Sequence, residues 1–383
     1  MMTPQNIFDP KHYEGVRKPL LEAETMPPFT YTSPEFYQRE VERIWRKTWN
    51  FIGSADQIRN KGDYFTLNFA GVPTIVLRDH DSKIRAFANT CRHRGSELLE
   101  GKGNCKLIVC PYHSWTYDLS GNLRGTPEMD KTLNFNKADY GLIPIAIDTW
   151  GNFLFINFDK NPEPLKKHLG DLPEKLAPYR LENMALARRK AFEMDCNWKL
   201  FVENAKESYH IGTVHRATIN QYASAKAAGY WVEKATGDYV VTFAQHEGSM
   251  ALLKGAKGFP VIESLEGRRE AGGTYAPLIY PSTYLACTID CAWYLEMHPI
   301  SPSKTYMVHG ALFPRDRLDR PDFEEVAKNY YHRWDVTIEE DILASVRQQR
   351  GLETPFAPPG RFSHREPLVH EIDNWVVDRV IGD

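Results

Sequence analysis

The chain has 383 residues, of which 42% are hydrophobic and 25% are charged, a composition typical of globular proteins. Its formal net charge of −3 shows no basic excess of the kind that nucleic-acid-binding surfaces carry. No apolar run approaches the roughly 18 residues that a membrane-spanning helix needs, and the first residues lack the apolar core of a secretory signal. We therefore expect a cytoplasmic protein of two domains that uses neither nucleic acid nor membrane as a partner.

The predicted elements change in character along the chain. Residues 33–49 predict a helix, because Ser33 is a suitable N-cap, Pro34 takes the first helical position, and apolar residues then recur at helical spacing. Up to about residue 160, short segments alternate apolar and polar side chains around Gly, Asp and Asn turns, which indicates a small β-sandwich or open barrel. The polar residues 161–185 predict a linker with a short helical piece.

The second half of the chain mixes helical and strand patterns. A helix is expected within 188–220, strands at 238–245, 283–298 and 304–313, and a long helix at about 321–350. On that last helix, the side chains expected to point inward are Val336, Ile338, Ile342, Leu343 and Val346. We therefore expect an α+β protein with an N-terminal arm (1–44), a β domain (45–160), the linker (161–185) and an α+β domain (186–383).

Residues 91–113, CRHRGSELLEGKGNCKLIVCPYH, place two Cys/His pairs on two predicted loops. Cys91 and His93 are followed, after sixteen residues, by Cys110 and His113. In a chain with only six cysteines and no sign of secretion, this cluster favours a metal site over a disulfide framework. An iron–sulfur cluster with one iron bound by two histidines needs this ligand set. Structural zinc, whose usual spacings differ, and four unrelated core side chains remain the alternatives.

The segment CRHRG…CPYHSWTYDLSGNL resembles the Rieske signature of the Rieske non-heme iron oxygenases, in which Cys-x-His and Cys-x-x-His precede x-Trp-x-Tyr. The resemblance implies a Rieske [2Fe–2S] cluster in which Cys91 and Cys110 bind one iron and His93 and His113 bind the other. Cys105 lies between the loops and matches no ligand position, so we expect an ordinary buried or partly buried thiol there.

A second candidate metal site lies in the segment ENAKESYHIGTVH. Glu207 and His210 are three residues apart and would share one face of a helix, whereas His215 follows five residues later. Two imidazoles and a distant carboxylate form the facial triad of O2-activating Fe(II) enzymes. The segment resembles the mononuclear-iron motif of the same family, acidic-x-x-His-x4-His, which implies that His210 and His215 are iron ligands. The resemblance also implies that Glu207 bridges to His113 of the partner subunit.

The third iron ligand is expected from the C-terminal helix, within TIEEDILASVRQQRGLE. This segment resembles the family's Glu-Asp…Gln-x-Gly-Leu pattern, in which the Asp is the ligand, and the resemblance therefore implies Asp341. Glu340 and Glu339 are the competing acids, and Asp335 is a poorer candidate. Without the resemblance, all four acids would be interpreted as solvated charges on a helix.

The resemblance covers nearly the whole chain and implies its domains and partners. Residues 45–160 would form the Rieske β-sandwich, and 186–383 a helix-grip-like catalytic domain in which helices flank an antiparallel sheet. The implied protein is the oxygenase component of a multicomponent NAD(P)H-dependent oxygenase, a homotrimeric ring that in some members includes a small beta subunit. The sequence has no dinucleotide-binding fingerprint and no plant-type ferredoxin motif, so electrons are expected from a separate reductase or ferredoxin.

The substrate is the part of the function that the sequence constrains least. The main expectation is hydroxylation, by mono- or dioxygenation, of a small aromatic substrate of carboxylate type, because VENAKESYHIGTVH is similar to alpha subunits that act on salicylate- or anthranilate-like acids. The alternative is oxidative N- or O-demethylation of a betaine- or carnitine-type quaternary amine, or of an aryl ether. An aromatic content of 12% suits an apolar pocket or an aromatic cage around an ammonium group. A Rieske electron-transfer protein is the non-enzymatic alternative.

Overall fold

The computed structural model of the chain describes residues 6–221 and 230–382. The chain divides into two compact units, Lys47–Leu165 and a second unit made of Met1–Arg46 together with Lys166–Asp383. The arm expected at 1–44 thus belongs to the same unit as the C-terminal half. Within the described ranges, every helix is too short or too polar to traverse a lipid bilayer.

The Lys47–Leu165 unit is built from antiparallel strands, as its alternating sequence pattern predicts. One sheet has seven strands in the order β1-β10-β9-β4-β3-β2-β5, and another has three in the order β6-β7-β8. The larger sheet consists of β1 (Asn50–Ser54), β2 (Asp63–Phe69), β3 (Val72–Arg78), β4 (Ile84–Ala88), β5 (Lys102–Asn104), β9 (Pro144–Trp150) and β10 (Phe153–Asn157). The smaller sheet consists of β6 (Ile108–Val109), β7 (Thr116–Tyr117) and β8 (Leu123–Gly125). The expected apolar strand at 150–159 contains β10, which is buried along its whole length.

The second unit contains a seven-stranded antiparallel sheet in the order β11-β17-β16-β15-β14-β13-β12. Its strands are β11 (Met184–Met194), β12 (Tyr230–Glu233), β13 (Tyr239–Gln245), β14 (Gly273–Ile279), β15 (Thr283–Cys287), β16 (Ala292–Ser301) and β17 (Lys304–Pro314). The expected strands at 238–245, 283–298 and 304–313 are confirmed as β13, the β15–β16 hairpin and β17.

Strands β11, β12 and β14 are not predicted from the sequence, and two of them have features that hide them. β11 lies at an edge of the sheet and carries the basic run Arg188, Arg189 and Lys190, a composition that edge strands tolerate but that does not resemble a strand core. β14 lies between β13 and β15 although it contains Pro277, a residue that cannot donate a backbone hydrogen bond. The expected linker at 161–185 contains two short helices, α3 (Leu165–Leu169) and α4 (Leu172–Leu176).

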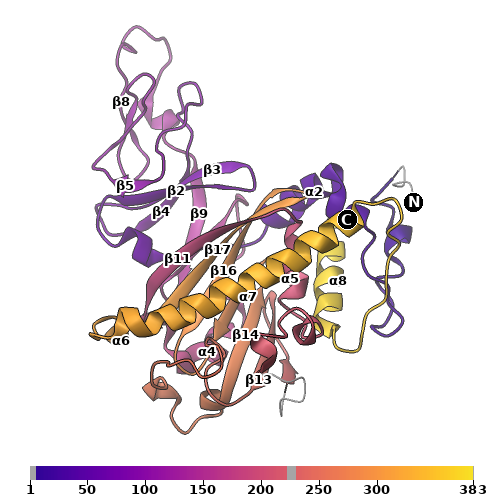
Figure 1. The fold of residues 1–383 in the computed structure, drawn as a ribbon. Coiled ribbons are helices and arrows are strands. Elements are labelled where there is room, and N and C mark those ends of the chain that lie inside the picture. Colours follow the sequence, from indigo (N-terminus) through magenta and orange to yellow (C-terminus); the bar gives the residue numbers. More distant parts are fainter. Residues whose placement is uncertain (1–5, 222–229, 383) are drawn as a thin grey trace. The chain divides into compact units, whose positions relative to one another are not determined.

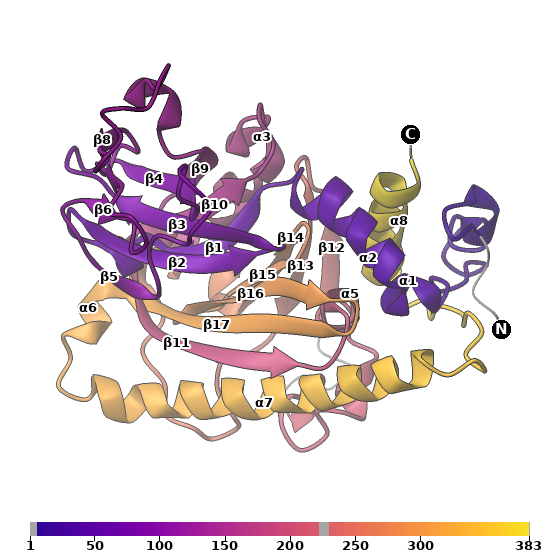
Figure 2. The same ribbon diagram turned by 90° about the horizontal axis from the view of Figure 1, so that it is seen from above.

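Helix α7 (Phe323–Leu352) lies across the sheet of the second unit (Figure 1), and the view from above shows it running along β11 and β17 (Figure 2). Trp334 joins the helix to the sheet through ring contacts with Trp293 on β16 and Phe313 on β17. The long helix expected at 321–350 is therefore confirmed. Of its expected inward residues, Ile338 is buried, but Leu343 is 52% exposed and was placed wrongly. Leu343 lies off the stripe in which buried side chains recur at helical spacing.

The N-terminal arm packs on the other helices of its unit. Helix α1 (Phe29–Thr32) is followed by α2 (Pro34–Glu40), which begins as expected with Ser33 as N-cap but ends early in a π-helical turn, Val41–Trp45. Glu40 and Lys199 form a fully buried ion pair of 2.6 Å that ties α2 to α5 (Trp198–Asn204). The other α-helices of the described residues are α6 (Arg315–Leu318) and α8 (Pro367–Ile381). Helix α5 is thereby held from the side of the arm, just before the segment that carries the candidate histidines.

Candidate functional site

The two Cys/His loops of the first unit have nearly the same backbone geometry. The N–H of Gly95 donates to the carbonyl of Cys91 (2.9 Å), and the N–H of Ser114 donates to the carbonyl of Cys110 (3.0 Å). The N–H of each cysteine donates in turn to the carbonyl five residues later, at 2.8 Å in both loops. Gly95 and Ser114 both adopt positive φ angles, +79° and +57°, which such a tight return of the chain requires. Each loop therefore presents its cysteine and histidine side chains on one tight turn.

The four predicted cluster ligands lie together. The side chains of Cys91 and Cys110 are in contact and are both 2% exposed. The rings of His93 and His113 have centroids 4.8 Å apart and an interplanar angle of 72°. Trp115 stacks on His93 with a centroid distance of 4.8 Å and an angle of 8°, which fixes the orientation of that imidazole. Two thiols and two imidazoles are thus brought to one place by two short loops.

The donor atoms of these residues fit a [2Fe–2S] cluster. Burial would raise the pKa of the Cys110 thiol, but the backbone N–H groups of Tyr112 and His113 donate to its sulfur, and the net pKa is lowered, which favours a thiolate. Nδ1 of His93 is buried and has no hydrogen-bond partner among the described residues. The hydroxyl of Tyr117 lies 3.4 Å from Sγ of Cys91. A thiolate held by N–H donors and an imidazole nitrogen left free are what a cluster with mixed ligands needs.

The segment that carries the second constellation is not one helix. Helix α5 ends at Asn204, so Glu207 and His210 do not share a helix face, and that expectation was wrong. The carboxylate of Glu207 instead accepts hydrogen bonds from the backbone N–H groups of Tyr209 and His210, the latter at 3.1 Å. His210 then begins a short 3-10 helix, His210–Gly212. The glutamate side chain satisfies backbone donors where the chain turns, and this turn brings His210 towards His215.

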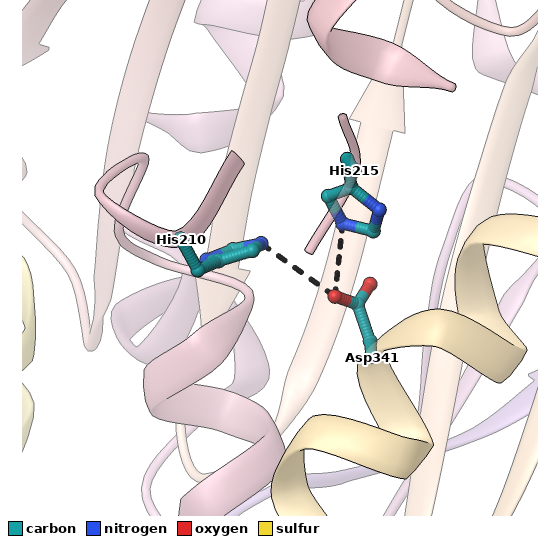
Figure 3. A group of neighbouring side chains, drawn as sticks. All are labelled: His210, His215 and Asp341. Carbon is teal, nitrogen blue, oxygen red and sulfur yellow. Dashed lines mark ion pairs between the residues drawn. The ribbon is translucent and has the colours of Figure 1, made fainter. Parts of the chain in front are cut away.

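His210, His215 and Asp341 converge on one point, as Figure 3 shows. Oδ1 of Asp341, on α7, lies 3.5 Å from Nε2 of His210 and 2.9 Å from Nε2 of His215. One ligand atom of each residue lies within 4.8 Å of the other two. The two imidazole rings have centroids 5.1 Å apart and are tilted by 66°. This arrangement is a two-histidine, one-carboxylate triad whose ligand atoms face a common point.

Each imidazole of the triad is oriented through its other nitrogen by a carboxylate. Nδ1 of His210 donates to Oε1 of Glu207 at 2.5 Å, and Nδ1 of His215 donates to Oε2 of Glu340 at 2.7 Å. Because an ionised carboxylate can only accept, both Nδ1 atoms carry the proton and both Nε2 atoms are free to bind a metal. Thr218 donates to the same Glu340 oxygen at 2.7 Å and holds that carboxylate in place. Carboxylate–histidine pairs of this kind orient the ligands of many metal sites.

The four acids that compete for the third position occupy different places on α7. Asp341 faces Nε2 of both histidines, whereas Glu340 lies on the Nδ1 side of His215. Glu339 has a side chain that is 66% exposed. Asp335 forms an ion pair of 2.7 Å with a basic side chain of β11. Of these four carboxylates, Asp341 alone is positioned to complete the triad.

The charge of the triad region suits a divalent cation. Oδ1 of Asp341 is buried and, although close to His215, forms no hydrogen bond of normal geometry with any described residue. Burial would lower the pKa of His215, but the neighbouring Asp341 and Glu340 outweigh burial and raise it. Three carboxylates surround two imidazoles, and this surplus of negative charge, with free nitrogen and oxygen donors, fits Fe(II).

A cavity of about 190 Å³ opens beside the triad. Its lining includes the aromatic side chains of Phe201, Tyr284, Trp293 and Trp334, together with Arg333. The cavity is smaller than the roughly 300–1,000 Å³ of pockets that hold drug-sized ligands. The site is therefore suited to a small molecule.

Two family models match the chain. The model of the Rieske [2Fe-2S] domain matches residues 48–142, and the model described as ring hydroxylating alpha subunit (catalytic domain) matches residues 181–382. The chain belongs to the Rieske oxygenase alpha subunits. This Rieske oxygenase is an enzyme whose cofactors are a Rieske [2Fe–2S] cluster and a mononuclear iron, and the α+β fold expected from the sequence is confirmed.

Three of the similar proteins have names that state a substrate or a bound ligand. The chloroplastic choline monooxygenase of Beta vulgaris is 30% identical over 98% of this chain and 81% of its own length. The glycine betaine monooxygenase oxygenase subunit of Chromohalobacter salexigens (strain ATCC BAA-138) is 27% identical over 94% of this chain and 86% of its own length. The crystal structure of the quaternary ammonium Rieske monooxygenase CntA with L-carnitine matches with a TM-score of 0.77 and 25% identity, covering 93% of this chain and 96% of that chain. These names favour the quaternary amine alternative over the aromatic substrate that was the main expectation.

Some residues of the two centres received no role from the sequence. Trp115 and Tyr117 are part of the Rieske signature, yet only the structure shows that they contact His93 and Cys91. Thr218 lies three residues beyond His215 and has no sequence signal that would single it out. Arg333 could have been found, because it precedes Asp341 by eight residues and lies on the same side of a predicted helix.

Proposed function

We propose that this Rieske oxygenase hydroxylates a small quaternary ammonium compound, with oxidative N-demethylation as the outcome. The observation that carries the proposal is the match, over 93% to 98% of the chain, to oxygenases named for choline, glycine betaine and L-carnitine. The cavity supports it, because the aromatic side chains of Phe201, Tyr284 and Trp293 line it, and aromatic rings bind ammonium cations. Hydroxylation of an aromatic acid has less support.

The proposed reaction converts one N-methyl group. O2, two electrons and two protons turn N–CH3 into N–CH2OH and one water, and the hydroxymethyl group then leaves the nitrogen as formaldehyde with loss of one proton. When bound, the mononuclear iron and the cluster supply O2 activation and electrons. The protein supplies a small, largely apolar cavity that places the methyl group next to the triad.

The ligand roles belong to the same proposal. His210 and His215 would hold the mononuclear iron through Nε2 and Asp341 through its carboxylate, which leaves the cavity side of the site for substrate and O2. Glu340 and Glu207 would keep the two imidazoles in the required tautomer. The Rieske cluster would be held by Cys91, His93, Cys110 and His113.

Glu207 would also connect the two kinds of iron centre between subunits. Its two oxygens accept hydrogen bonds from the ring of His210 and from backbone N–H groups. Each carboxylate oxygen has two lone pairs, so a further donor can be accepted. We expect that donor to be His113 of the partner subunit, in a homotrimer whose head-to-tail interface closes into a ring.

The partner proteins follow from the oxygenase role. We expect a separate NAD(P)H-dependent reductase, directly or through a ferredoxin, to deliver electrons to the cluster. Light scattering on purified protein should give about three times the 44.1 kDa subunit mass. An added small beta subunit would appear as a second band of lower mass after copurification, and a monomer would contradict the proposed route between subunits.

Steady-state turnover with a surrogate reductase tests the proposed function. The panel contains glycine betaine, choline, L-carnitine and salicylate, and the readouts are O2 consumption, formaldehyde, and product mass. We expect O2 consumption coupled to a demethylated amine with at least one of the ammonium compounds. A hydroxylated aromatic acid as the only product would replace the proposal with the aromatic alternative.

A further inference from the structure

The cavity beside the triad contains a buried guanidinium group. Arg333 lines the cavity and is 7% exposed. It lies on α7 together with Thr337 and Asp341, each four residues from the next, so all three side chains leave the same side of the helix. Two helical turns, about 12 Å along the axis, separate the backbones of Arg333 and Asp341. A positive charge thus lies at some distance from the triad in the same cavity.

Arg333 lines the cavity and has no carboxylate partner among the described residues. Lys199, a buried cation of the same unit, pairs with Glu40 at 2.6 Å. The buried Lys206 donates to the backbone carbonyl of Ala276 at 2.6 Å and does not line the cavity. Within residues 6–221 and 230–382, no carboxylate lies within ion-pair distance of the Arg333 guanidinium; its hydrogen bond goes to the hydroxyl of Thr337 at 3.3 Å. The segment 222–229, YASAKAAG, contains no acidic residue.

The remaining surroundings of Arg333 are aromatic or more distant. Its guanidinium lies over the ring of Trp293, 5.4 Å from the centroid. Burial lowers the pKa of Arg333, while the charges of Tyr284 and Asp341 act in the opposite direction. A buried charge without a hydrogen-bonded counter-ion is costly, and it is stable when a ligand supplies the missing anion. Planar guanidinium groups bind carboxylates in a two-point geometry.

We propose that Arg333 binds the carboxylate of the substrate, so that the preferred ligand is a zwitterion with a quaternary ammonium group and a carboxylate. With the carboxylate at Arg333, the methylated end of a small ligand extends along the cavity towards His210, His215 and Asp341. A cation without a carboxylate, such as choline, would face a buried like charge and gain no contact in return. The ammonium half of this inference rests on the proposed function, whereas the carboxylate half does not.

Anaerobic titration calorimetry on the iron-loaded protein tests the inference without turnover, because no reductase is present. The ligands are glycine betaine, L-carnitine, choline and salicylate, measured against wild type, Arg333→Gln and the matched control Arg347→Gln, which replaces an exposed arginine of the same helix. We expect Arg333→Gln to weaken binding of the zwitterions by about 100-fold, the size of effect seen when one partner of a buried charge pair is removed. Choline affinity should stay the same or rise, and Arg347→Gln should bind all four ligands like wild type.

A second variant covers the case in which Arg333→Gln does not fold. Arg333→Lys keeps the charge but loses the planar two-point geometry, so the zwitterions should bind about tenfold more weakly. Circular dichroism and the visible absorption of the cluster show whether each variant is intact. In turnover with a surrogate reductase, the loss should appear in KM more than in kcat.

The outcomes separate this inference from the proposed function. Equal weakening of choline and the zwitterions would mean that Arg333 is structural and would overturn the inference while the proposed function stands. Binding of salicylate, but of no ammonium compound, with dependence on Arg333 would retain the carboxylate-binding role and refute the proposed function. Unchanged zwitterion affinity in both variants would refute the role of Arg333 outright.

Discussion

The Rieske loops and the mononuclear site of this chain are assembled over different sequence distances. The cluster ligands all fall within residues 91–113 and are placed by two turns with matching hydrogen bonds. The triad joins residues near His215 to residues near Asp341, and the hydrogen bond between His215 and Glu340 spans 125 positions. A change in a cluster loop should therefore affect one centre locally, whereas the triad also depends on how α7 packs on the sheet.

The largest expected effects separate the two centres completely. Cys110→Ser should remove the visible absorption of the cluster and leave the mononuclear iron, because a buried thiolate held by two backbone N–H groups is lost. Asp341→Ala should remove the mononuclear iron and all turnover, and leave the cluster spectrum intact. Iron per subunit, visible spectra and O2 consumption measure these losses. Glu339→Gln, a change of an exposed acid on the same helix, is the control and should behave like wild type.

The next largest effect concerns the connection between the centres. Glu207→Gln keeps an oxygen that can accept from His210 but removes the charge that would stabilise a donor from the partner subunit. We expect both metals to remain bound. Reoxidation of the reduced cluster, measured after rapid mixing with O2 and substrate, should slow by about 10- to 100-fold. Glu207→Ala should in addition lose iron, because His210 is no longer oriented. Reoxidation at the wild-type rate in Glu207→Gln would remove Glu207 from the route of the electrons.

A smaller effect is expected at the second carboxylate–histidine pair. Glu340→Gln replaces the acceptor that orients His215 and that also binds Thr218. Such changes typically weaken metal binding by about 10- to 100-fold, and we expect the lower end because the glutamine oxygen can still accept. Competition with an iron chelator measures the change. If iron affinity is the same in Glu340→Gln and Glu339→Gln, Glu340 does not support the site.

The last predicted effect is on stability, not on metal binding or turnover, and arises from a buried contact between α5 and the N-terminal arm. Glu203, on α5, accepts a hydrogen bond from Tyr31 of the arm at 2.9 Å. Burial raises the pKa of Glu203 from 4.5 to about 7, against the effects of Tyr31 and Lys199, and burial also raises the pKa of the neighbouring Asp373. Between pH 4.5 and about pH 7, Glu203 keeps its proton in the folded protein and releases it in the unfolded chain. The free energy of unfolding should therefore fall as pH rises from about 5 to about 8, by up to roughly 3 kcal/mol.

Urea unfolding at the two ends of this pH range measures the effect. Glu203→Gln cannot titrate, so its free energy of unfolding should change less with pH than that of wild type. Comparison of the slopes removes the contribution of other groups, including the metal ligands. Identical slopes in the two proteins would show that Glu203 does not carry the proton.

The sequence predicted the local parts of the molecule better than the remote ones. Ser33 and Pro34 begin a helix as predicted, because capping acts within one turn. The Cys/His loops can be recognised from the sequence because their turns are formed by neighbouring residues. The edge strand β11 was hidden by its basic run, and Glu207 was placed on a helix that ends three residues earlier. Propensity contains no information on which backbone N–H groups a glutamate will satisfy.

The choice among the acids of α7 shows the same limit. From the sequence, Asp335 was a poorer candidate than Glu339, Glu340 and Asp341, and the resemblance favoured Asp341 among these. Which carboxylate faces Nε2 of His215 and which faces Nδ1 depends on the rotation of α7 against the sheet, a property of packing over more than one hundred residues. For the same reason, the lack of a carboxylate within ion-pair distance of Arg333 among the described residues could be seen only in three dimensions.

A single-turnover experiment tests the central claim most directly. Protein with both iron centres reduced chemically is mixed with O2 and glycine betaine, and cluster oxidation and product are measured in the same sample. We expect oxidation of the cluster together with a demethylated amine and formaldehyde in amounts that approach the number of mononuclear sites. Oxidation of the cluster without any product from glycine betaine, L-carnitine or choline, but with hydroxylation of salicylate, would contradict the account.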